Sequence, residues 1–260
     1  MCLFYTATLS FAKPPIQLAI VLDDLGNSKH DLQALKLPTQ ITFAVLPYTP
    51  FAKKLAKQAH SQNRELLLHM PMQAKIHNEK LGKGALMLNM QELVFKEELS
   101  KALHYFPGAT AMNNHMGSTL TEHIEPMQWT MEVLNKQGLY FLDSRTSAQT
   151  IAQSTAQISG VPALRRHIFL DNIKTNKAMT EQLQQALEIG KNNLPVVIIA
   201  HPYPETIQFL RDNFTQQNQQ FDLVPLHQLL SQSERLAIAK KRNEWQQAQN
   251  IIINHTKQTQ

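Results

Sequence analysis

Polar side chains close six of the apolar runs in this sequence, and their types are those that bind metal ions or move protons. The runs end on aspartate or histidine, and no cysteine takes part. The carboxyl ends of the strands of a parallel α/β sheet meet at one rim, so we expect these side chains to form one active centre there. The six runs are VLDD at 21–24, LLLH at 66–69, NNH at 113–115, FLD at 141–143, FLD at 169–171 and IIAH at 198–201.

Adjacent aspartates together with several histidines favour hydrolysis at a metal ion. Histidine and carboxylate ligands hold a divalent ion that lowers the pKa of water to about 7, while a second carboxylate accepts the proton. Asp23 and Asp24 point in opposite directions as long as their strand is regular, but a turn at Leu25-Gly26 can aim both at the rim. One of them then binds the metal and the other acts as base. Capping of the following helix is the alternative role for one of the pair.

Short apolar strands and amphipathic helices alternate from Ile16 onward and supply the framework for these residues. The runs at 16–22 and 41–46 are typical of buried strands, and Thr49 is expected to cap the helix that follows the second run. About eight βα-like units can be counted, which favours a closed or nearly closed barrel over an open sheet. The segment 74–90 shows no clear period and is expected to form a long loop at the rim.

The composition indicates one packed α/β domain. The chain has 260 residues, of which 43% are hydrophobic, enough for a sizeable core. The net charge is +5, but the basic residues are scattered singly, which argues against binding to nucleic acid. Cys2 is the only cysteine, so disulfides, CxxC redox chemistry and zinc–thiolate sites are excluded from a mature chain that has lost it. After the N-terminus no segment has transmembrane length, so stable membrane insertion is not expected.

Residues 1–15 have features of an export signal. The stretch MCLFYTATLSFAKPP is apolar and lacks acidic residues, and SFA at 10–12 matches the small-x-small pattern of a signal-peptidase site. No positive charge precedes Lys13, so a disordered arm is the alternative. We expect a periplasmic or otherwise exported protein with one domain over 16–230. The Gln-, Lys- and Arg-rich residues 231–260 are expected to form a peripheral C-terminal extension.

Five motifs in this order resemble the divergent polysaccharide deacetylase family of bacterial envelopes. They are VLDDLG, LLLHMPM, NNHMGS, FLDSRTS and IAHPYPET, and the resemblance extends over residues 16–230. This family is related to the NodB-type carbohydrate esterases, so the resemblance implies a distorted (β/α) barrel in a single domain. It also implies metal-dependent removal of N- or O-acetyl groups from a polysaccharide or peptidoglycan-like glycan.

The resemblance also implies roles for the residues at the rim. Asp23 corresponds to the catalytic base and Asp24 to the metal-binding aspartate, although these two assignments can be exchanged. His69 corresponds to the first histidine of the esterases' paired-histidine motif. His201 corresponds to the histidine that acts as general acid and protonates the leaving group.

Two departures from the esterase pattern change the expected ligands and substrate contacts. Gln73 stands where the esterases have their second histidine, so His115, at the end of the next strand, is the expected replacement. The arginine-proline-tyrosine motif is absent, and NNHMGS takes its place in the strand order. The residues expected to orient or bind the substrate are Asn114, Ser118, Asp143 and Arg145.

Two further aspartates close runs at the same rim. Asp143 is expected to orient His201, to bind substrate hydroxyls, or to form a salt bridge with Arg145. Asp171 has the same pleat parity as His167 but lies nearer the rim, so it is the better candidate of the two.

The sequence leaves the metal and the activity open. One aspartate and two histidines favour zinc as the divalent metal, and nickel, cobalt or manganese also accept such a ligand set. The alternative to an enzyme is a catalytically inactive periplasmic module that binds a glycan or a protein on the same fold. Gln73 and the missing arginine motif both favour that alternative.

Overall fold

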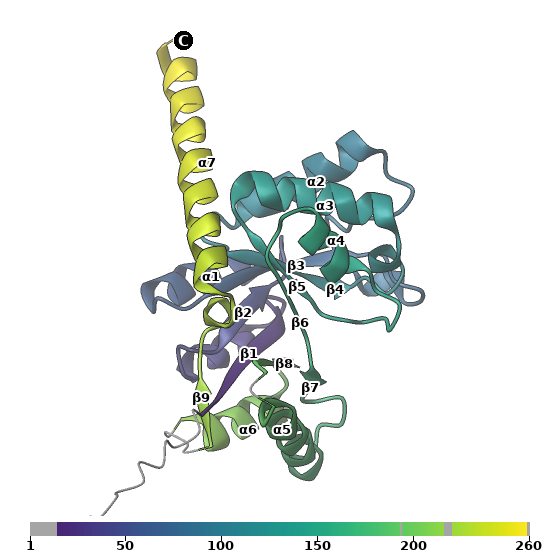
Figure 1. The fold of residues 1–260 in the computed structure, drawn as a ribbon, viewed down its shortest axis with the longest axis vertical. Coiled ribbons are helices and arrows are strands. Elements are labelled where there is room, and N and C mark those ends of the chain that lie inside the picture. Colours follow the sequence, from purple (N-terminus) through teal and green to yellow (C-terminus); the bar gives the residue numbers. More distant parts are fainter. Residues whose placement is uncertain (1–14, 193, 216–219, 259–260) are drawn as a thin grey trace, which may run out of the picture.

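A nine-stranded sheet runs through the chain in the computed structural model, which describes residues 15–192, 194–215 and 220–258 (Figure 1). Neighbouring strands are parallel and follow the order β6-β5-β4-β3-β2-β1-β8-β7, with β9 beside β1. The strands are β1 (Ile16–Leu25), β2 (Thr42–Val45), β3 (Leu66–Met72), β4 (Ala111–Met116), β5 (Tyr140–Asp143), β6 (Ala163–Arg165), β7 (Ile168–Phe169), β8 (Val196–Ala200) and β9 (Phe221–Leu223).

Helices connect most of these strands, because parallel neighbours need a crossover that carries the chain back along the sheet. The α-helices are α1 (Ala52–Ser61), α2 (Glu92–Tyr105), α3 (Ile124–Gln137), α4 (Ala152–Ile158), α5 (Asn176–Gly190), α6 (Pro204–Phe214) and α7 (Gln232–Gln258). Four short 3-10 helices are η1 (Lys29–Lys36), η2 (Asn78–Lys80), η3 (Leu120–Glu122) and η4 (Leu226–Leu229).

The helix after β2 begins later than its sequence indicates. Thr49 does not cap α1, because its hydroxyl donates to the carbonyl of Leu46 at 3.0 Å within a separate turn. The helix starts at Ala52, after that turn. The loop between β2 and α1 is therefore longer than predicted, and it stands at the rim.

The sheet curls into a half-barrel whose two ends are joined by a short stretch of the chain. β6 and β7 lie at opposite ends of the strand order, yet only residues 166 and 167 separate them in sequence. The N–H of Arg166 donates to the carbonyl of Asp143 at the end of β5, and the N–H of His167 donates to Val197 in β8, both at 2.9 Å. A backbone connection thus spans the gap between β6 and β7, which we call the seam, in place of a full strand pairing. The predicted single-domain distorted (β/α) barrel is confirmed in this open form.

Two apolar clusters lie on the two faces of the sheet. The larger cluster contains Leu18, Ile20 and Leu22 of β1 and packs against the surrounding helices. The smaller cluster contains Ala19 and Val21, together with buried residues from five other strands. Leu226 and Leu230 belong to this second cluster, and Ile238 packs against it. The C-terminal segment therefore covers part of the sheet face that lies inside the half-barrel.

The final helix, α7, is anchored at its beginning and projects from the rest of the molecule at its far end (Figure 1). It packs closely on α3, where a Cβ on Gly138 would lie 2.4 Å from the backbone nitrogen of Arg242. The rings of Trp245 and His104 are also in contact, with centroids 6.0 Å apart. Among the described residues, no helix is both long and apolar enough to cross a membrane. The predicted export signal falls almost wholly on residues 1–14, outside the described part.

Candidate metal centre

The inner face of the sheet carries polar side chains above its apolar cluster. Ala19 and Val21 of β1 face inward, and the two-residue repeat of a strand brings Asp23 onto the same face. Other strands repeat this arrangement, with a polar residue two positions beyond an inward apolar one. The inward polar residues are His69 above Leu67, Asn113 and His115 above Ala111, and His201 above Ile199.

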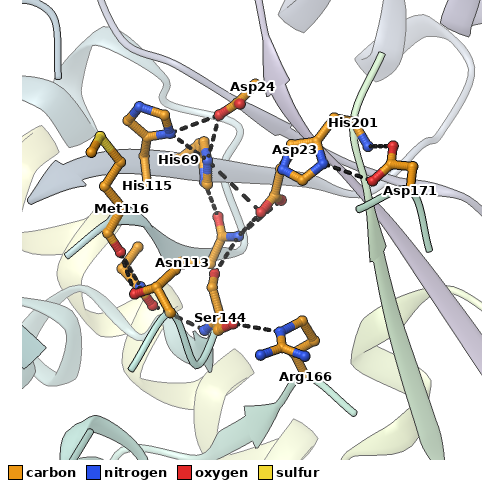
Figure 2. Close-up of polar contacts among 12 residues, drawn as sticks. Asp23, Asp24, His69, Asn113, His115, Met116, Ser144, Arg166, Asp171 and His201 are labelled. Carbon is orange, nitrogen blue, oxygen red and sulfur yellow. Dashed lines mark hydrogen bonds and ion pairs between the residues drawn. The ribbon is translucent and has the colours of Figure 1, made fainter. Parts of the chain in front are cut away.

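Asp24, His69 and His115 each direct one donor atom toward a common point (Figure 2). Asp24 Oδ1 lies 3.0 Å from His69 Nε2 and 2.7 Å from His115 Nδ1, and the two ring nitrogens are 3.2 Å apart. Alternation along β1 would turn Asp24 away from this face. Its left-handed backbone, with φ of 58°, brings the carboxylate back toward the histidines. These are the three residues that were predicted as metal ligands.

This donor set fits a divalent metal ion. Two imidazoles and one carboxylate suit zinc and several other transition metals. Tetrahedral ligands about 2.0–2.1 Å from an ion are roughly 3.3 Å from one another, and the donor atoms here are 2.7 to 3.2 Å apart. Three protein ligands leave a fourth position for water or substrate, which is the pattern of catalytic sites. The geometry therefore suits a catalytic ion without fixing its identity.

Asn113 connects one candidate metal ligand, His69, to Asp23. Its Nδ2 donates to both carboxylate oxygens of Asp23, at 2.9 and 3.0 Å. The amide oxygen therefore faces His69 and accepts a hydrogen bond from Nδ1–H at 2.9 Å. Because Nδ1 is bonded to Asn113, Nε2 is the ring nitrogen of His69 that faces Asp24 and His115. A single amide thus orients a ligand and the carboxylate beside it.

The two adjacent aspartates have opposite electrostatic environments. Burial raises the pKa of Asp23, and the charge of Asp24 adds to this effect, while nearby histidines partly oppose it. Burial also disfavours the charge on Asp24, but hydrogen bonds from His115 and His69 outweigh it and hold the pKa of Asp24 well below its usual range. A raised pKa suits a proton acceptor and a lowered one suits a permanent anion. The environment favours Asp23 as base and Asp24 as ligand.

A buried carboxylate holds His201 beside Asp23. Nδ1 of His201 donates to Asp171 Oδ1 at 2.9 Å, and the backbone N–H of His201 donates to Oδ2 at 2.7 Å. Burial alone would lower the pKa of His201, but the hydrogen bond to Asp171 and the charges of three aspartates outweigh it and raise the pKa to about 9. His201 is therefore protonated at neutral pH, which suits a proton donor.

Asn114, predicted to orient or bind the substrate, is buried on the other face of β4. Alternation from Asn113 places it there. Its Oδ1 accepts from the N–H of Ser144 at 2.9 Å, and its Nδ2 donates to the carbonyl of Met116 at 2.8 Å. With 1% of its surface exposed, Asn114 braces the loops after β4 and β5 and offers no surface to a substrate.

Asp143 is likewise turned away from the centre. Its carboxylate accepts from the N–H of Arg145 at 2.8 Å and from the hydroxyl of Thr150 at 3.0 Å, and the side chain has no exposed surface. It holds the loop after β5. The prediction that Asp143 orients His201 is wrong, because Asp171 occupies that position.

Ser118 and Arg145 remain at the rim. The hydroxyl of Ser118 accepts from the N–H of Lys75 at 3.0 Å, which ties the loop after β4 to the loop after β3. Arg145 has a left-handed φ of 49°, and its carbonyl accepts from the guanidinium of Arg166 at 2.7 Å. Substrate contact by Ser118 and Arg145 stays a prediction.

Gln73 supports the rim and is not directed at the ligands. Its Oε1 accepts from the N–H of Leu88 at 2.8 Å, and its carbonyl accepts from two N–H groups of the loop after β4. His115 approaches from the adjacent strand and supplies the third donor atom of the candidate metal site. His115 of β4 therefore supplies the donor atom that the esterase pattern would place at position 73.

Three residues of the centre are absent from the sequence-based set. Asn113 joins His69 to Asp23, and its Nδ2 also lies 3.2 Å from the hydroxyl of Ser144. Arg166 donates from Nε to the carbonyl of Ser144 at 2.7 Å, and its guanidinium lies 3.7 Å from the centroid of a phenylalanine ring. Asn113 shares the parity of His115, a signal that the sequence contains. The contact of Arg166 depends on the barrel seam, which no local pattern indicates.

Left-handed backbone recurs around the rim. Among the described residues, six other than glycine have φ between 49° and 63°, and all but Asn63 lie at or after the ends of β1 to β5. Such conformations cost of the order of 1–3 kcal/mol each and gather at functional sites. The five residues at or after strand ends are Asp24, Tyr48, His77, Met116 and Arg145.

A cleft of about 540 Å³ opens beside two of the three candidate ligands, Asp24 and His115. Tyr48 and Lys83 also line it, from the loops after β2 and β3. Ligand sites of about 300–1,000 Å³ hold molecules of drug size. The metal centre is therefore accessible to a substrate larger than an acetyl group.

Residues 20–230 match the family described as divergent polysaccharide deacetylase. The chain belongs to this family. The matched range extends from β1 to the end of η4 and includes every residue of the metal centre. The resemblance carried by the five motifs is thereby confirmed.

Relatives of this family member share much of its length. A protein of Escherichia coli (strain K12) named uncharacterized protein YibQ is 35% identical over 212 residues, which is 80% of this chain and 66% of that protein. An uncharacterized protein of Haemophilus influenzae (strain ATCC 51907 / DSM 11121 / KW20 / Rd) is 36% identical over 203 residues, 78% of this chain and 72% of that protein. This chain thus spans about two thirds of the length of the first relative.

A solved structure shows the same fold. The uncharacterized protein ATU2773 of Agrobacterium tumefaciens C58 superposes with a TM-score of 0.77, over 85% of this chain and 91% of that chain. The two sequences are 20% identical, so the likeness concerns the fold alone.

Proposed function

We propose that this protein is a metal-dependent hydrolase that removes N- or O-acetyl groups from an envelope or extracellular polysaccharide, including peptidoglycan-like glycans. One observation carries the proposal. The donor atoms of Asp24, His69 and His115 meet beside two groups in complementary protonation states, Asp23 and His201. Hydrolysis of an amide or ester needs a proton acceptor for water and a proton donor for the leaving group.

The chain's own residues account for the proton transfers. A divalent ion, with zinc favoured, would supply an activated water and polarisation of the acetyl carbonyl. Asp23 accepts a proton as the water oxygen bonds to the carbonyl carbon. His201 gives its proton to the leaving nitrogen or oxygen as the C–N or C–O bond breaks. The products are acetate and a free amine or hydroxyl, and proton exchange with solvent restores both side chains.

Asn113 and Asp171 position the two proton-transferring groups. Asn113 holds both oxygens of Asp23, and Asp171 fixes the ring of His201 through Nδ1, which leaves Nε2 for the leaving group. Groups held in this way need little reorganisation during the reaction. The same contacts support Asp23 as base and His201 as acid.

Acetate release and metal content test the proposal together. The purified protein, reconstituted with zinc, is incubated with N-acetylchitooligosaccharides or peptidoglycan fragments, and acetate is quantified beside the Asp23→Asn variant. We expect one bound ion per chain and acetate release that depends on Asp23. Absence of bound metal, or equal release by the variant, contradicts the mechanism. Glycan binding without acetate release would instead identify the glycan-binding module.

We also propose that the protein acts in the periplasm or outside the cell, because the proposed polymers lie beyond the cytoplasmic membrane. Fractionation of cells that make the natural full-length protein tests this. Recovery in the cytoplasmic fraction alone contradicts it.

A further inference from the structure

We propose that the cleft beside the metal centre binds a glycan chain of several sugars, with the ring of Tyr48 as the surface on which one sugar lies. The proposal rests on the proposed function for the position of the reacting sugar. It goes further in assigning a length of chain and a residue that selects for it.

The cleft lies between the candidate ligands and the loops after β2 and β3. Asp24 and His115 line it together with Tyr48 of the first loop and Lys83 of the second. Tyr48 and Lys83 also line a second hollow of about 730 Å³, which continues over α2. Because the two hollows share these residues, a chain held at the metal centre would pass Tyr48 and continue beyond it.

The backbone of Tyr48 is held in a conformation that a bulky residue rarely adopts. Its φ is 61°, in the left-handed region. The surrounding turn is fixed on both sides, because the N–H of Leu46 donates to Leu25 and the N–H of Phe51 donates to Gly26, both at 2.9 Å. The strained residue is partly exposed at the cleft, while the rest of its side chain packs against the larger apolar cluster. Strain kept at such a place indicates a binding role.

The chemistry of this wall suits a sugar. An aromatic ring combines a flat apolar surface with, in tyrosine, a hydroxyl at its edge. The ammonium of Lys83 lies 5.6 Å from the centroid of the Tyr48 ring, and Lys80 lines the same cleft. A pyranose ring presents a C–H face and peripheral hydroxyls, which match the ring and these donors. Ligand sites are commonly built from aromatic walls with few polar groups.

Direct binding measurements test the role of Tyr48. Metal-loaded Asp23→Asn protein is titrated calorimetrically with N-acetylchitobiose and N-acetylchitopentaose. We expect tighter binding of the pentamer. Tyr48→Ala should lower the affinity for the pentamer about tenfold, as loss of a well-packed aromatic contact does. Tyr48→Phe keeps the ring and should retain the affinity.

A pair of glycine variants tests the position of the ring without removing it. A Cβ on Gly84 would lie 2.6 Å from Cε2 of Tyr48, so Gly84→Ala must displace the ring. Gly82 in the same loop has a similar φ, 83° against 80°, but a Cβ there meets nothing within 4 Å. We expect Gly84→Ala to weaken pentamer binding and Gly82→Ala to weaken it less. Circular dichroism and metal content confirm that each variant is folded.

Three results would overturn the proposal. They are equal affinity of the parent for dimer and pentamer, unchanged pentamer affinity in Tyr48→Ala, and equal weakening by the two glycine variants. If Tyr48→Ala fails to fold, the glycine pair still decides. Acetate release is measured separately, so the proposed hydrolysis and the chain-binding cleft can each fail while the other stands.

Discussion

Asp23 and His201 have pKa values shifted in the same direction, yet their proposed roles need opposite protonation states. Burial raises the pKa of Asp23, and the pairing with Asp171 outweighs burial to raise that of His201 to about 9. Activity then requires a pH above the pKa of Asp23, so that it can accept a proton, and below the pKa of His201, so that it can donate one. The plot of kcat/KM against pH should be bell-shaped, with an alkaline limb near pH 9.

The alkaline limb should move when Asp171 is neutralised. Asp171→Asn removes the main charge that favours protonated His201, so the pKa of His201 falls and the limb shifts to lower pH. The measurement is kcat/KM between pH 5 and 10. Asp212→Asn is the matched control, because it removes one charge from an exposed position on α6. If the alkaline limb of the kcat/KM profile stays in place in Asp171→Asn, a group other than His201 determines it.

Metal affinity should depend on His115 and, less strongly, on Asn113. His115→Ala removes one of three ligands, and we expect loss of stoichiometric binding. Asn113→Ala frees the ring of His69, and loss of such supporting contacts lowers metal affinity or activity roughly 10–100-fold. Competition with a chromogenic chelator measures both. His104→Ala changes an exposed histidine of α2 whose ring contacts Trp245, and it should bind metal normally. Full metal binding by His115→Ala would mean that another side chain completes the ligand set.

The sequence identifies residues that end a strand more readily than the direction in which they point. Asp24, His69 and His115 were found because each follows an apolar run. Asp143 follows an equally apolar run, but its parity matches Phe141 in the helix-facing cluster, so it points outward. The two faces can be distinguished only once strand packing is known. Asn113 differs from Asp143, because its shared parity with His115 can be seen in the sequence itself.

At the scale of elements, the turn between β2 and α1 depends on Gly26. Its φ is 120°, and a Cβ there would lie 2.2 Å from Oγ1 of Thr49. Gly26→Ala should therefore destabilise the protein by about 2 kcal/mol or more in urea unfolding, because backbone strain and a steric clash combine. Gly160→Ala, with φ of 68° and nothing within 4 Å, carries the strain alone and should cost less. Equal losses of unfolding free energy in the two variants would contradict the predicted clash with Thr49.

The order of strands and helices followed from sequence periodicity, whereas the closure of the barrel did not. The buried runs at 16–22 and 41–46 correspond to β1 and β2. The seam depends on two backbone N–H groups, of Arg166 and His167, which bond to strands far away in sequence. Side-chain patterns carry no information about such bonds. The late start of α1 has a similar origin, since Thr49 bonds backward within its turn.

At the scale of the whole molecule, Glu65 joins several elements at the end of the barrel opposite the metal centre. Its carboxylate accepts from the hydroxyls of Thr42, Thr110 and Tyr140, at 3.2, 3.0 and 2.7 Å. It also accepts from the backbone of His227 at 3.0 Å, which attaches the C-terminal segment. Burial alone would raise the pKa of Glu65, but the contacts with His227 outweigh it and lower this pKa.

This cluster should make stability depend on pH. The hydrogen bond to Glu65 raises the pKa of His227 above its usual value. The contribution of His227 to the free energy of unfolding is therefore complete below the pKa of about 6.5 that it has in the unfolded chain. This contribution is lost as pH rises through the pKa of His227 in the folded protein. The lowered pKa of Glu65 has the opposite sign, so its contribution is lost as pH falls through the folded value.

Urea unfolding between pH 4 and 10 checks this dependence. The difference in unfolding free energy between the parent and His227→Gln should shrink toward alkaline pH. It should shrink again at acid pH, as Glu65 becomes protonated. His30→Gln alters an exposed histidine on η1 and serves as control. A difference that stays constant over the range would contradict the role of the ion pair.

The seam of the barrel also bears on self-association. A sheet with two free edges exposes rows of N–H and C=O groups to which another chain can add a strand. Here the two edge strands, β6 and β7, are neighbours in sequence, and the residues between them bond to β5 on one side and β8 on the other. The connection therefore occupies backbone groups of β5 and β8 between the two ends of the strand order. We expect it to hinder the addition of a strand from a second copy of the chain at these ends.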